Sequence, residues 1–247
     1  MDIKEIDILG DDLHRHWYYL SKGRALQSFL QPYHPRSILD VGAGSGIFSK
    51  ILLRSTRAES AVCVDIGYDE ERSEAYHHKR IEFKRSINRS DANLALFMDV
   101  IEHVDDDAGL LRTYAELLSP GALVLITVPA FPFLFSGHDL FLEHKRRYTL
   151  TSLESTVRRA GLEVIKSRYF FGLLFPIAAA QRLLNRICLK SNHIEPKSAL
   201  KKHTPLINSM LSTINNLELL AFPYNRFAGL TIFCLAHRSE CSTTRYA

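Results

Sequence analysis

Three glycines at alternate positions mark the part of this sequence best suited to hold a ligand. They follow a short apolar run in the segment Ser37-Ile-Leu-Asp-Val-Gly-Ala-Gly-Ser-Gly46. Glycine loses the most conformational freedom on folding, so this density indicates a turn whose backbone passes close to a ligand. The residue three after Gly44 is Ile47, which excludes the G-x-G-x-x-G spacing of dinucleotide-binding loops. No Gly-Lys-Ser/Thr triplet follows, which also excludes the phosphate-binding loop of nucleoside triphosphatases.

A second carboxylate lies at the distance expected for the next strand of a parallel sheet. Ala61-Val-Cys-Val-Asp65 is typical of a buried strand, and Asp65 lies 25 residues after Asp40, about the length of a β-α-β unit. An acidic residue at the tip of the second strand can bind both hydroxyls of a ribose. The two segments together predict a site for a nucleoside-containing ligand.

The pattern D-x-G-x-G-x-G resembles the first motif of class I S-adenosylmethionine (SAM) methyltransferases, and the resemblance covers about residues 36–170. It implies an α/β fold, with a doubly wound, seven-stranded, Rossmann-like sheet whose last strand is antiparallel. It also implies that SAM is the cofactor and that Asp65 binds its ribose. Many relatives carry an acidic residue for the adenine amine where this chain has Ser86. The cofactor-binding residues expected on this basis are Asp40, Gly42, Gly44, Gly46, Asp65, Ile66, Ser86, Met98 and Asp99.

Acidic and histidine side chains follow the fourth predicted strand, in Met98-Asp-Val-Ile-Glu-His-Val104. The string resembles D/E-V-x-E-H-V of methyltransferases related to the ubiquinone O-methyltransferases. The N/D-P-P-Y/F motif of nucleic-acid amino methylases is absent here, so we expect no nucleic-acid substrate. His103 is a candidate general base, since its ordinary pKa lies near neutrality. Two alternatives stay open: Asp99, Glu102 and His103 bind a divalent metal, or the acids only favour a helix start.

The segment after the fifth predicted strand combines an aromatic wall with polar groups. Val128-Pro-Ala-Phe-Pro-Phe-Leu-Phe135 precedes His138, Asp139 and His144-Lys-Arg-Arg-Tyr148. It resembles the V-P-A-x-P…S-x-H-D…H-x-R-R-Y segment of one bacterial branch of the same superfamily. We expect His138, paired with Asp139, to be the first candidate for the general base, with His144 and His103 as further catalytic candidates. Arginines bind anionic groups through forked hydrogen bonds, or they brace the loop. The expected substrate-binding residues are Asp139, Arg146, Arg147, Tyr148 and Trp17.

The first helix is the predicted lid over the methionyl end of the cofactor. It carries His16-Trp17-Tyr18-Tyr19, followed by two basic residues, Lys22 and Arg24. The bacterial branch often begins with a similar string. The resemblance implies that a basic residue, Lys22 in our first choice, binds the cofactor's carboxylate. Trp17 also suits a core position.

We expect one methyltransferase domain over residues 1–247, with an N-terminal helical lid at 1–35. Strands are predicted at 37–41, 61–66, 80–84, 92–98, 122–128, 162–171 and 230–237, with helices between most of them and a short exposed helix at 68–79. Residues 172–229 interrupt the usual link between strands six and seven. Two predicted helices in this insertion, 173–189 and 206–222, form a helical cap beside the substrate pocket.

Composition narrows the class of protein further. No run of 18 apolar residues and no signal-peptide pattern is present, so a cytoplasmic protein is expected. The four cysteines lack the spacing of a disulfide scaffold or zinc finger. The insertion holds seven Lys and Arg against two Glu, while the whole chain carries only +4. Peripheral contact with an anionic membrane through 172–229 and a homodimer contact are therefore alternatives to a pure lid.

We interpret the chain as a SAM-dependent methyltransferase acting on a small-molecule or lipid-linked acceptor. O-methylation with a histidine general base and no resident metal is the first interpretation. A metal-assisted O-methyltransferase of the ubiquinone type is an alternative. A non-catalytic SAM-binding protein that docks through its basic helices is another. The sequence does not identify the acceptor.

Overall fold

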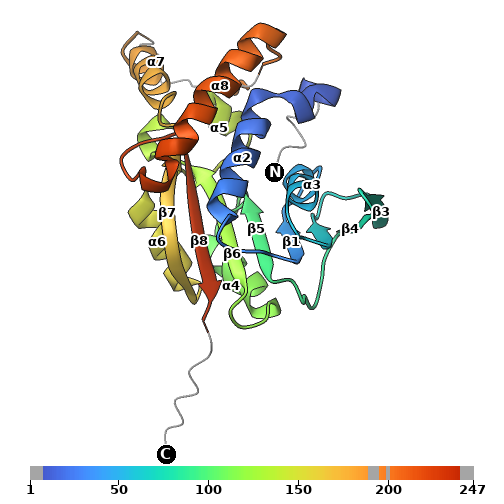
Figure 1. Cartoon of the computed structure of the whole chain (residues 1–247). Helices are drawn as coiled ribbons and strands as arrows, with labels where there is room; N and C mark the ends of the chain where they lie inside the picture. Colours follow the sequence, from blue (N-terminus) through green and yellow to red (C-terminus); the bar gives the residue numbers. More distant parts are fainter. Residues whose placement is uncertain (1–7, 189–194, 199–200, 240–247) are drawn as a thin grey trace, which may run out of the picture.

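One mixed sheet organises the molecule (Figure 1). The structure is a computed structural model, and it describes residues 8–188, 195–198 and 201–239. The strands are β1 (Ser37–Val41), β2 (Ser60–Val64), β3 (Arg72–Tyr76), β4 (Lys79–Lys84), β5 (Leu94–Met98), β6 (Leu123–Pro129), β7 (Leu162–Phe170) and β8 (Thr231–Arg238). Their order across the sheet is β3-β4-β2-β1-β5-β6-β8-β7.

The sheet has the parallel centre that the motifs predict. β1 pairs parallel with β2 and β5, while β8 lies antiparallel between β6 and β7. The innermost strands are nearly continuous apolar runs, such as Leu94-Ala-Leu-Phe-Met98, and all five of these residues are buried. Such runs are typical of parallel strands covered on both faces. The predicted doubly wound α/β class and the antiparallel last strand are confirmed.

Helices cover both faces of the sheet. The helices are α2 (Trp17–Leu30), α3 (Ile47–Ser55), α4 (Asp107–Leu117), α5 (Gly137–Phe141), α6 (Leu150–Arg159), α7 (Phe175–Cys188) and α8 (Pro205–Ala221), with short 3₁₀ turns η1 (Gly10–Arg15), η2 (Ile101–His103), η3 (Pro132–Leu134) and η4 (Phe222–Tyr224). One apolar core joins α2 and α3 to one face. A second core joins α4 and α6 to the other face. The N-terminal helical segment predicted within 1–35 is divided at His16, where η1 ends and α2 begins.

The expectation of a helix at 68–79 is wrong, and it accounts for the eighth strand. Residues Arg72–Tyr76 form β3, which pairs antiparallel with β4 at the edge of the sheet. His77 and His78 both have positive φ, 49° and 62°, and Tyr76 pairs directly with Lys79. Two residues with positive φ make the tight hairpin turn whose twist suits two antiparallel strands. The turn therefore decides the structure of this polar segment.

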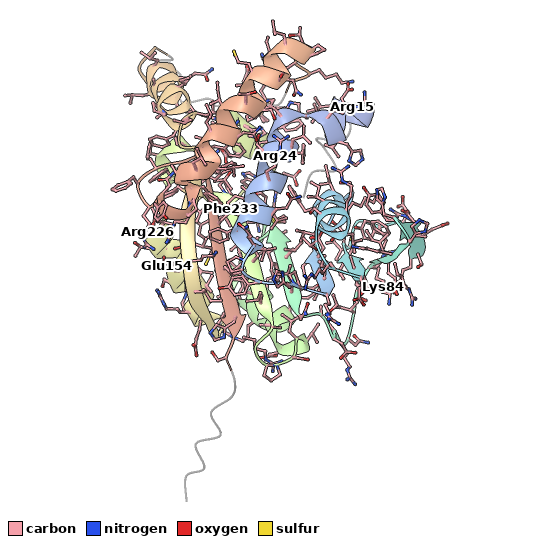
Figure 2. All side chains as sticks on the ribbon, viewed as in Figure 1. Arg15, Arg24, Lys84, Glu154, Arg226 and Phe233 are labelled. Atoms are coloured by element: carbon pink, nitrogen blue, oxygen red, sulfur yellow. The ribbon has the colours of Figure 1, made fainter. Side chains whose placement is uncertain are left out.

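The insertion contains two helices, α7 and α8, and the described residues 195–198 and 201–204 lie between them in the sequence. α8 packs along α2, where Arg24 donates hydrogen bonds to Ser212 and Asn216 (Figure 2). α7 starts near the loop after β6, and the ring centroids of Phe131 and Phe175 are 5.2 Å apart. Within the described residues, no helix combines the length and the apolar character required to cross a bilayer.

Candidate active site

The loop after β1 has a backbone that only glycine adopts easily. Gly42, Gly44 and Gly46 have φ values of 65°, 53° and 68°. A Cβ at Gly42 would lie 2.8 Å from a methyl group of Val100, and one at Gly46 would lie 3.1 Å from the Cys63 sulfur. The loop leads into the amino end of α3, at the edge where ligands of open α/β sheets bind.

Asp65 is bonded to this loop from the end of β2. Its carboxylate accepts hydrogen bonds from the backbone N–H of Gly44 at 3.0 Å and of Gly67 at 2.9 Å. Ile66, the next residue, is 86% exposed, and Ser86 is exposed just after β4. The structure therefore brings Asp65 to the glycine loop, with Ile66 and Ser86 on the surface beyond the ends of β2 and β4.

Asp40 lies beneath the loop. It is buried, and its carboxylate accepts a hydrogen bond of 2.8 Å from the Ser49 hydroxyl on α3. Its position suits a residue that fixes the loop to the helix.

Two buried polar atoms, one in the glycine loop and one on α2, are available to a bound ligand. The Ser45 hydroxyl and the Trp17 indole N–H are buried without a hydrogen-bond partner among the described residues. A buried unpaired donor or acceptor costs free energy, so such atoms favour a site that a polar ligand completes. Together with the glycine loop and Asp65, they suit the amino acid and nucleoside parts of SAM.

Asp99, directly after β5, has an unusual backbone conformation and is paired with a lysine. Asp99 has a positive φ of 56°, which is uncommon for a residue other than glycine and often marks a functional site. Its carboxylate accepts hydrogen bonds from the Thr127 hydroxyl at 3.0 Å and from the ammonium of Lys22. Burial opposes its ionisation, but the charge and hydrogen bond of Lys22, together with the hydrogen bond from Thr127, outweigh burial and keep the pKa of Asp99 below its ordinary value. Met98, just before it, is fully buried.

Lys22 differs from the expectation for the lid. Its side chain is fully buried, and its ammonium lies in an ion pair with Asp99, a carboxylate of the protein itself. Arg24, the other basic candidate, binds α8 instead. Trp17 packs edge-on against Phe171, with ring centroids 5.8 Å apart. α2 is therefore fixed to the sheet through Lys22, next to the glycine loop.

An Asp–His pair forms in the loop after β6, between Asp139 and His144. His144 Nδ1 lies 3.0 Å from Asp139 Oδ1, and Arg147 donates to the same oxygen at 2.6 Å. The other carboxylate oxygen caps α5 by accepting from Ser136 N–H at 2.8 Å. Burial alone would raise the pKa of Asp139, but His144 and Arg147 hold it well below its ordinary value. A carboxylate so placed fixes the ring of His144.

His144 joins two residues of η2 in a compact cluster. Its Nε2 lies 3.9 Å from Glu102 Oε1, and its ring centroid is 4.8 Å from that of His103. One ligand atom from each of the three side chains lies within 4.8 Å of the others. Glu102 is fully buried, neither of its carboxylate oxygens has a hydrogen-bond partner among the described residues, and burial raises its pKa. Burial also lowers the pKa of His103 to about 4.

Other expected substrate residues brace this region. Arg146 donates to the carbonyl oxygens of Val104 and Asp105, and the buried Tyr148 hydroxyl donates to Asp107 at 2.9 Å. The second contact of Arg147 is the carbonyl oxygen of Ala130 at 3.0 Å. For these arginines and for Tyr148 the structure therefore supports the bracing alternative.

His138 was the first candidate for the base, and Asp139 its expected partner. It lies on α5, and burial lowers its pKa to about 4. The hydrogen bonds described for Asp139 go to Ser136, His144 and Arg147. The structure therefore places His144, from the same motif, in the position that the sequence suggested for His138.

Sequence reasoning missed Tyr18 and Thr127, which both contact Asp99. The Tyr18 hydroxyl lies 3.4 Å from Asp99 Oδ2, and its ring stacks on Phe171. Thr127 is the polar residue in the otherwise apolar strand β6, and this exception was a usable signal.

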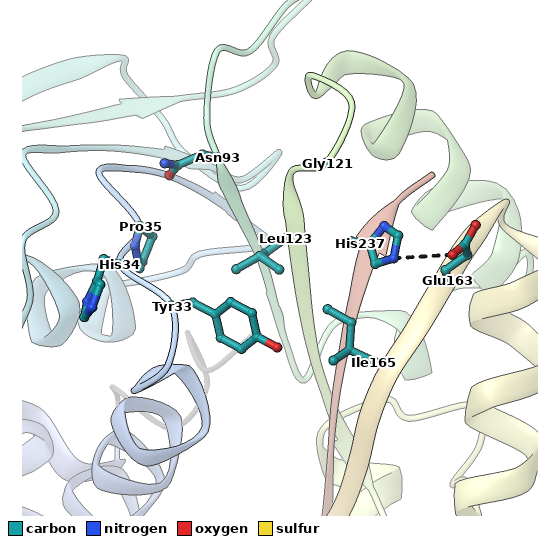
Figure 3. A pocket seen from close by; sticks show the side chains of 9 residues that line it. All are labelled: Tyr33, His34, Pro35, Asn93, Gly121, Leu123, Glu163, Ile165 and His237. Atoms are coloured by element: carbon teal, nitrogen blue, oxygen red, sulfur yellow. Dashed lines mark ion pairs between the residues drawn. The ribbon is translucent and has the colours of Figure 1, made fainter. Parts of the chain in front are cut away.

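A groove of about 700 Å³ lies at the opposite end of the sheet (Figure 3). Tyr33, Asn93 and Leu123 line one part of it, and His237 forms a 3.4 Å ion pair with Glu163 in another. Asn93 and Leu123 mark the amino ends of β5 and β6, away from the glycine loop. Because ligands of such sheets bind at the carboxyl ends of the strands, we assign the site to the glycine loop rather than to this groove.

Sequence comparisons relate the chain to known methyltransferases. A family model described as a methyltransferase domain matches residues 13–167. A ubiquinone biosynthesis O-methyltransferase of Parvibaculum lavamentivorans is 25% identical over 158 residues, which are 55% of this chain and 62% of that protein. One from Psychrobacter arcticus is 26% identical over 117 residues, 41% of this chain and 45% of that protein. The match thus spans less than two thirds of either relative.

Solved structures share the fold at low identity. A complex between the Haloferax volcanii Trm112 methyltransferase activator and the putative methyltransferase matches with a TM-score of 0.53 and 15% identity, over 96% of this chain and 92% of that one. A putative methyltransferase from Bacillus halodurans matches with a TM-score of 0.51 and 12% identity, over 87% and 99%. A Haemonchus contortus phosphoethanolamine N-methyltransferase 2, solved with SAM, has a TM-score of 0.51 and 14% identity, over 88% and 52%.

Proposed function

The chain belongs to the family of class I, SAM-dependent methyltransferases, and we propose that it methylates a hydroxyl oxygen of a small or lipid-linked acceptor. Bound SAM supplies an electrophilic methyl group on a sulfonium sulfur. We assign Asp65 to the ribose and the glycine loop to the methionyl part. The support is the position of both at the carboxyl edge of the sheet.

The observation that carries O-methylation is the pair between Asp139 and His144. With its Nδ1–H donated to Asp139, His144 keeps Nε2 as a proton acceptor. In the proposed reaction the acceptor oxygen bonds to the methyl carbon, the carbon–sulfur bond breaks, and the hydroxyl proton passes to His144 Nε2. Asp139 then stabilises the charged imidazole, as a buried carboxylate does in other Asp–His pairs. Holding the reacting atoms in line supplies much of the acceleration.

A metal-assisted reaction is the second candidate, and the unpaired carboxylate of Glu102 favours it. Glu102, His103 and His144 offer one oxygen and two nitrogen ligands, a set that suits zinc, manganese or iron. Asp99, expected in this set, is bound to Lys22 and Thr127. A cation held by the three side chains would bind the acceptor oxygen and lower its pKa, so no histidine base would be needed.

Turnover with labelled SAM tests both candidates. Phenols, catechols, sugars, carboxylates and isoprenoid quinols are offered as acceptors, and the products are identified by mass spectrometry. We expect an O-methylated product that His144→Gln abolishes and His237→Gln preserves, because His237 lies at the opposite end of the sheet. Methylation of nitrogen or carbon only would overturn the proposal.

Chelation separates the two candidates. Activity that survives chelator supports the histidine base. Activity lost with chelator and restored by one divalent ion supports the metal site. Metal bound by the wild type but not by Glu102→Gln, measured by calorimetry without substrates, would place the ion in this cluster.

A further inference from the structure

One side of α8 carries large apolar side chains that the described chain leaves open to solvent. Leu206, Met210, Leu217 and Leu220 are 81, 55, 62 and 79% exposed. Their spacings of four, seven and three residues place them on one side of a helix. The other side packs on the protein, where Asn215 and Glu218 are buried. The exposed side is thus an apolar stripe along the outside of the molecule.

α7 and the turn after α8 extend this apolar surface. Ile177 and Leu184 on α7 are 69 and 58% exposed, and Phe227, after η4, is 89% exposed. Single exposed apolar residues are ordinary, but a large set on two helices indicates an interaction surface. Both helices lie at the end of the molecule where the parallel strands terminate (Figure 1).

Three lysines lie beside the apolar surface, where Glu195 is also exposed and Lys202 forms a 3.7 Å ion pair with Asp12. Lys197, Lys201 and Lys202 are exposed just before α8. Of the two acids in the insertion, Glu218 is buried and accepts hydrogen bonds from the backbone N–H groups of Gly172 and Leu173. The net charge offered to a partner is therefore positive.

We propose that α7 and α8 dock the enzyme on the surface of an anionic lipid bilayer. Leucine and methionine side chains of the stripe enter the boundary between headgroups and acyl chains, and the lysines contact lipid phosphates. An apolar face next to basic residues is the pattern of helices that lie in a membrane interface, and anionic lipids attract such lysines. Charge complementarity favours this partner over a second copy of the chain, whose insertion carries the same positive charge.

Docking in this orientation gives the proposed reaction a source of acceptor. The carboxyl edge that holds the glycine loop and His144 lies at the same end of the molecule as α7 and α8 (Figure 1). An acceptor with an isoprenoid or acyl chain can then reach the site from the membrane. This consequence rests on the proposed methyl transfer, whereas the docking itself does not.

Co-sedimentation of the full chain with vesicles tests the docking. We expect binding to vesicles of equal parts phosphatidylcholine and phosphatidylglycerol, much weaker binding to phosphatidylcholine alone, and a decline with added salt. Leu217→Ser with Leu220→Ser, and separately Lys201→Glu with Lys202→Glu, should each weaken binding by more than about tenfold. Arg54→Glu with Arg89→Glu makes the same charge change at exposed positions outside the insertion and should leave most of the binding. Circular dichroism verifies that each variant is folded.

Three outcomes overturn the proposal. One is no binding to the anionic vesicles at low salt. Another is an equal loss in the arginine control, which would mean attraction by overall charge. The third is a concentration-dependent dimer, seen by analytical ultracentrifugation, that Leu217→Ser with Leu220→Ser dissociates. That result would make the stripe an interface between copies. Because the assay contains neither SAM nor acceptor, failure here leaves the proposed methyl transfer standing.

Discussion

The loop after β1 and the loop after β6 lie on the same edge of one sheet, yet different forces hold them. The first loop is held by its backbone, with three glycines at positive φ and the Gly44 amide bonded to Asp65. The second is a side-chain structure, in which Asp139 binds His144 and Arg147. The first loop therefore depends on the absence of side chains, and the second on charge. Mutations and pH should affect the two loops differently.

The largest effect is expected in the loop after β6. We expect His144→Ala to lower kcat by about 10²–10⁴-fold, as the loss of a general base does. SAM affinity, measured by calorimetry, should stay unchanged because the glycine loop is separate. The matched control is His138→Ala, a histidine of the same loop, which should retain most of the activity. A greater loss in His138→Ala than in His144→Ala would return the role to His138.

The next effect concerns cofactor binding at the first loop. Asp65→Ala should weaken the binding of SAM and S-adenosylhomocysteine by at least about tenfold, because even one hydrogen bond to a charged group contributes roughly 1.5–3 kcal/mol. Asp69→Ala removes an exposed carboxylate a few residues further on and should change affinity little. If Asp65→Ala binds both ligands like the wild type, Asp65 is not part of the cofactor site.

Two glycine substitutions together test how closely Gly42 of the first loop packs against Val100. Gly42 and Gly121 both have positive φ, but a Cβ at Gly121 meets no atom within 4 Å, whereas at Gly42 it meets Val100. Alanine in the left-handed region costs about 1–2 kcal/mol at either site. Gly42→Ala should therefore lower the free energy of unfolding by more than Gly121→Ala does, in denaturant titrations. Equal losses would show that the loop moves to avoid Val100.

A pH dependence of stability is expected in the cluster beside the second loop. Burial lowers the pKa of His103 to about 4, below its value of about 6.5 in the unfolded chain. The unfolded state then binds more protons between these values, so stability falls as pH drops through this window, by up to about 1.4 kcal/mol per pH unit. His103→Gln should flatten that slope in urea titrations. If the slope of unfolding free energy against pH is the same in the variant, other groups such as His138 cause the pH dependence.

The sequence predicted those parts of the fold whose geometry depends on residues close together in the chain. The glycine loop and Asp65 follow apolar strands, and neighbouring residues decide their geometry. The segment at 68–79 was mistaken for a helix because its charges look like a solvated helix face, while the turn at His77 and His78 favours a hairpin.

The histidine partner of Asp139 could not be chosen from sequence spacing alone. His138 precedes Asp139 directly, which made the two look like a pair, but adjacent residues of a helix do not face each other. Glu143, with a φ of 62°, turns the chain back after α5, so that the His144 N–H bonds to the Asp139 carbonyl at 2.8 Å. This turn requires a positive φ at Glu143, and a glutamate gives no sequence signal for that conformation.

The pairing of β7 with β8 has a consequence for how this protein can evolve. Phe170 and Thr231 are direct partners, and the Leu230 N–H bonds to the Phe170 carbonyl at 2.9 Å, so the insertion leaves and re-enters the sheet at one point. Gly229 makes this junction close, since a Cβ there would lie 2.3 Å from the same carbonyl oxygen. The entropy cost of a loop with fixed ends grows only with the logarithm of its length. Evolution can therefore lengthen, shorten or exchange the segment between these two strands while the register of the sheet and the glycine loop stay as they are.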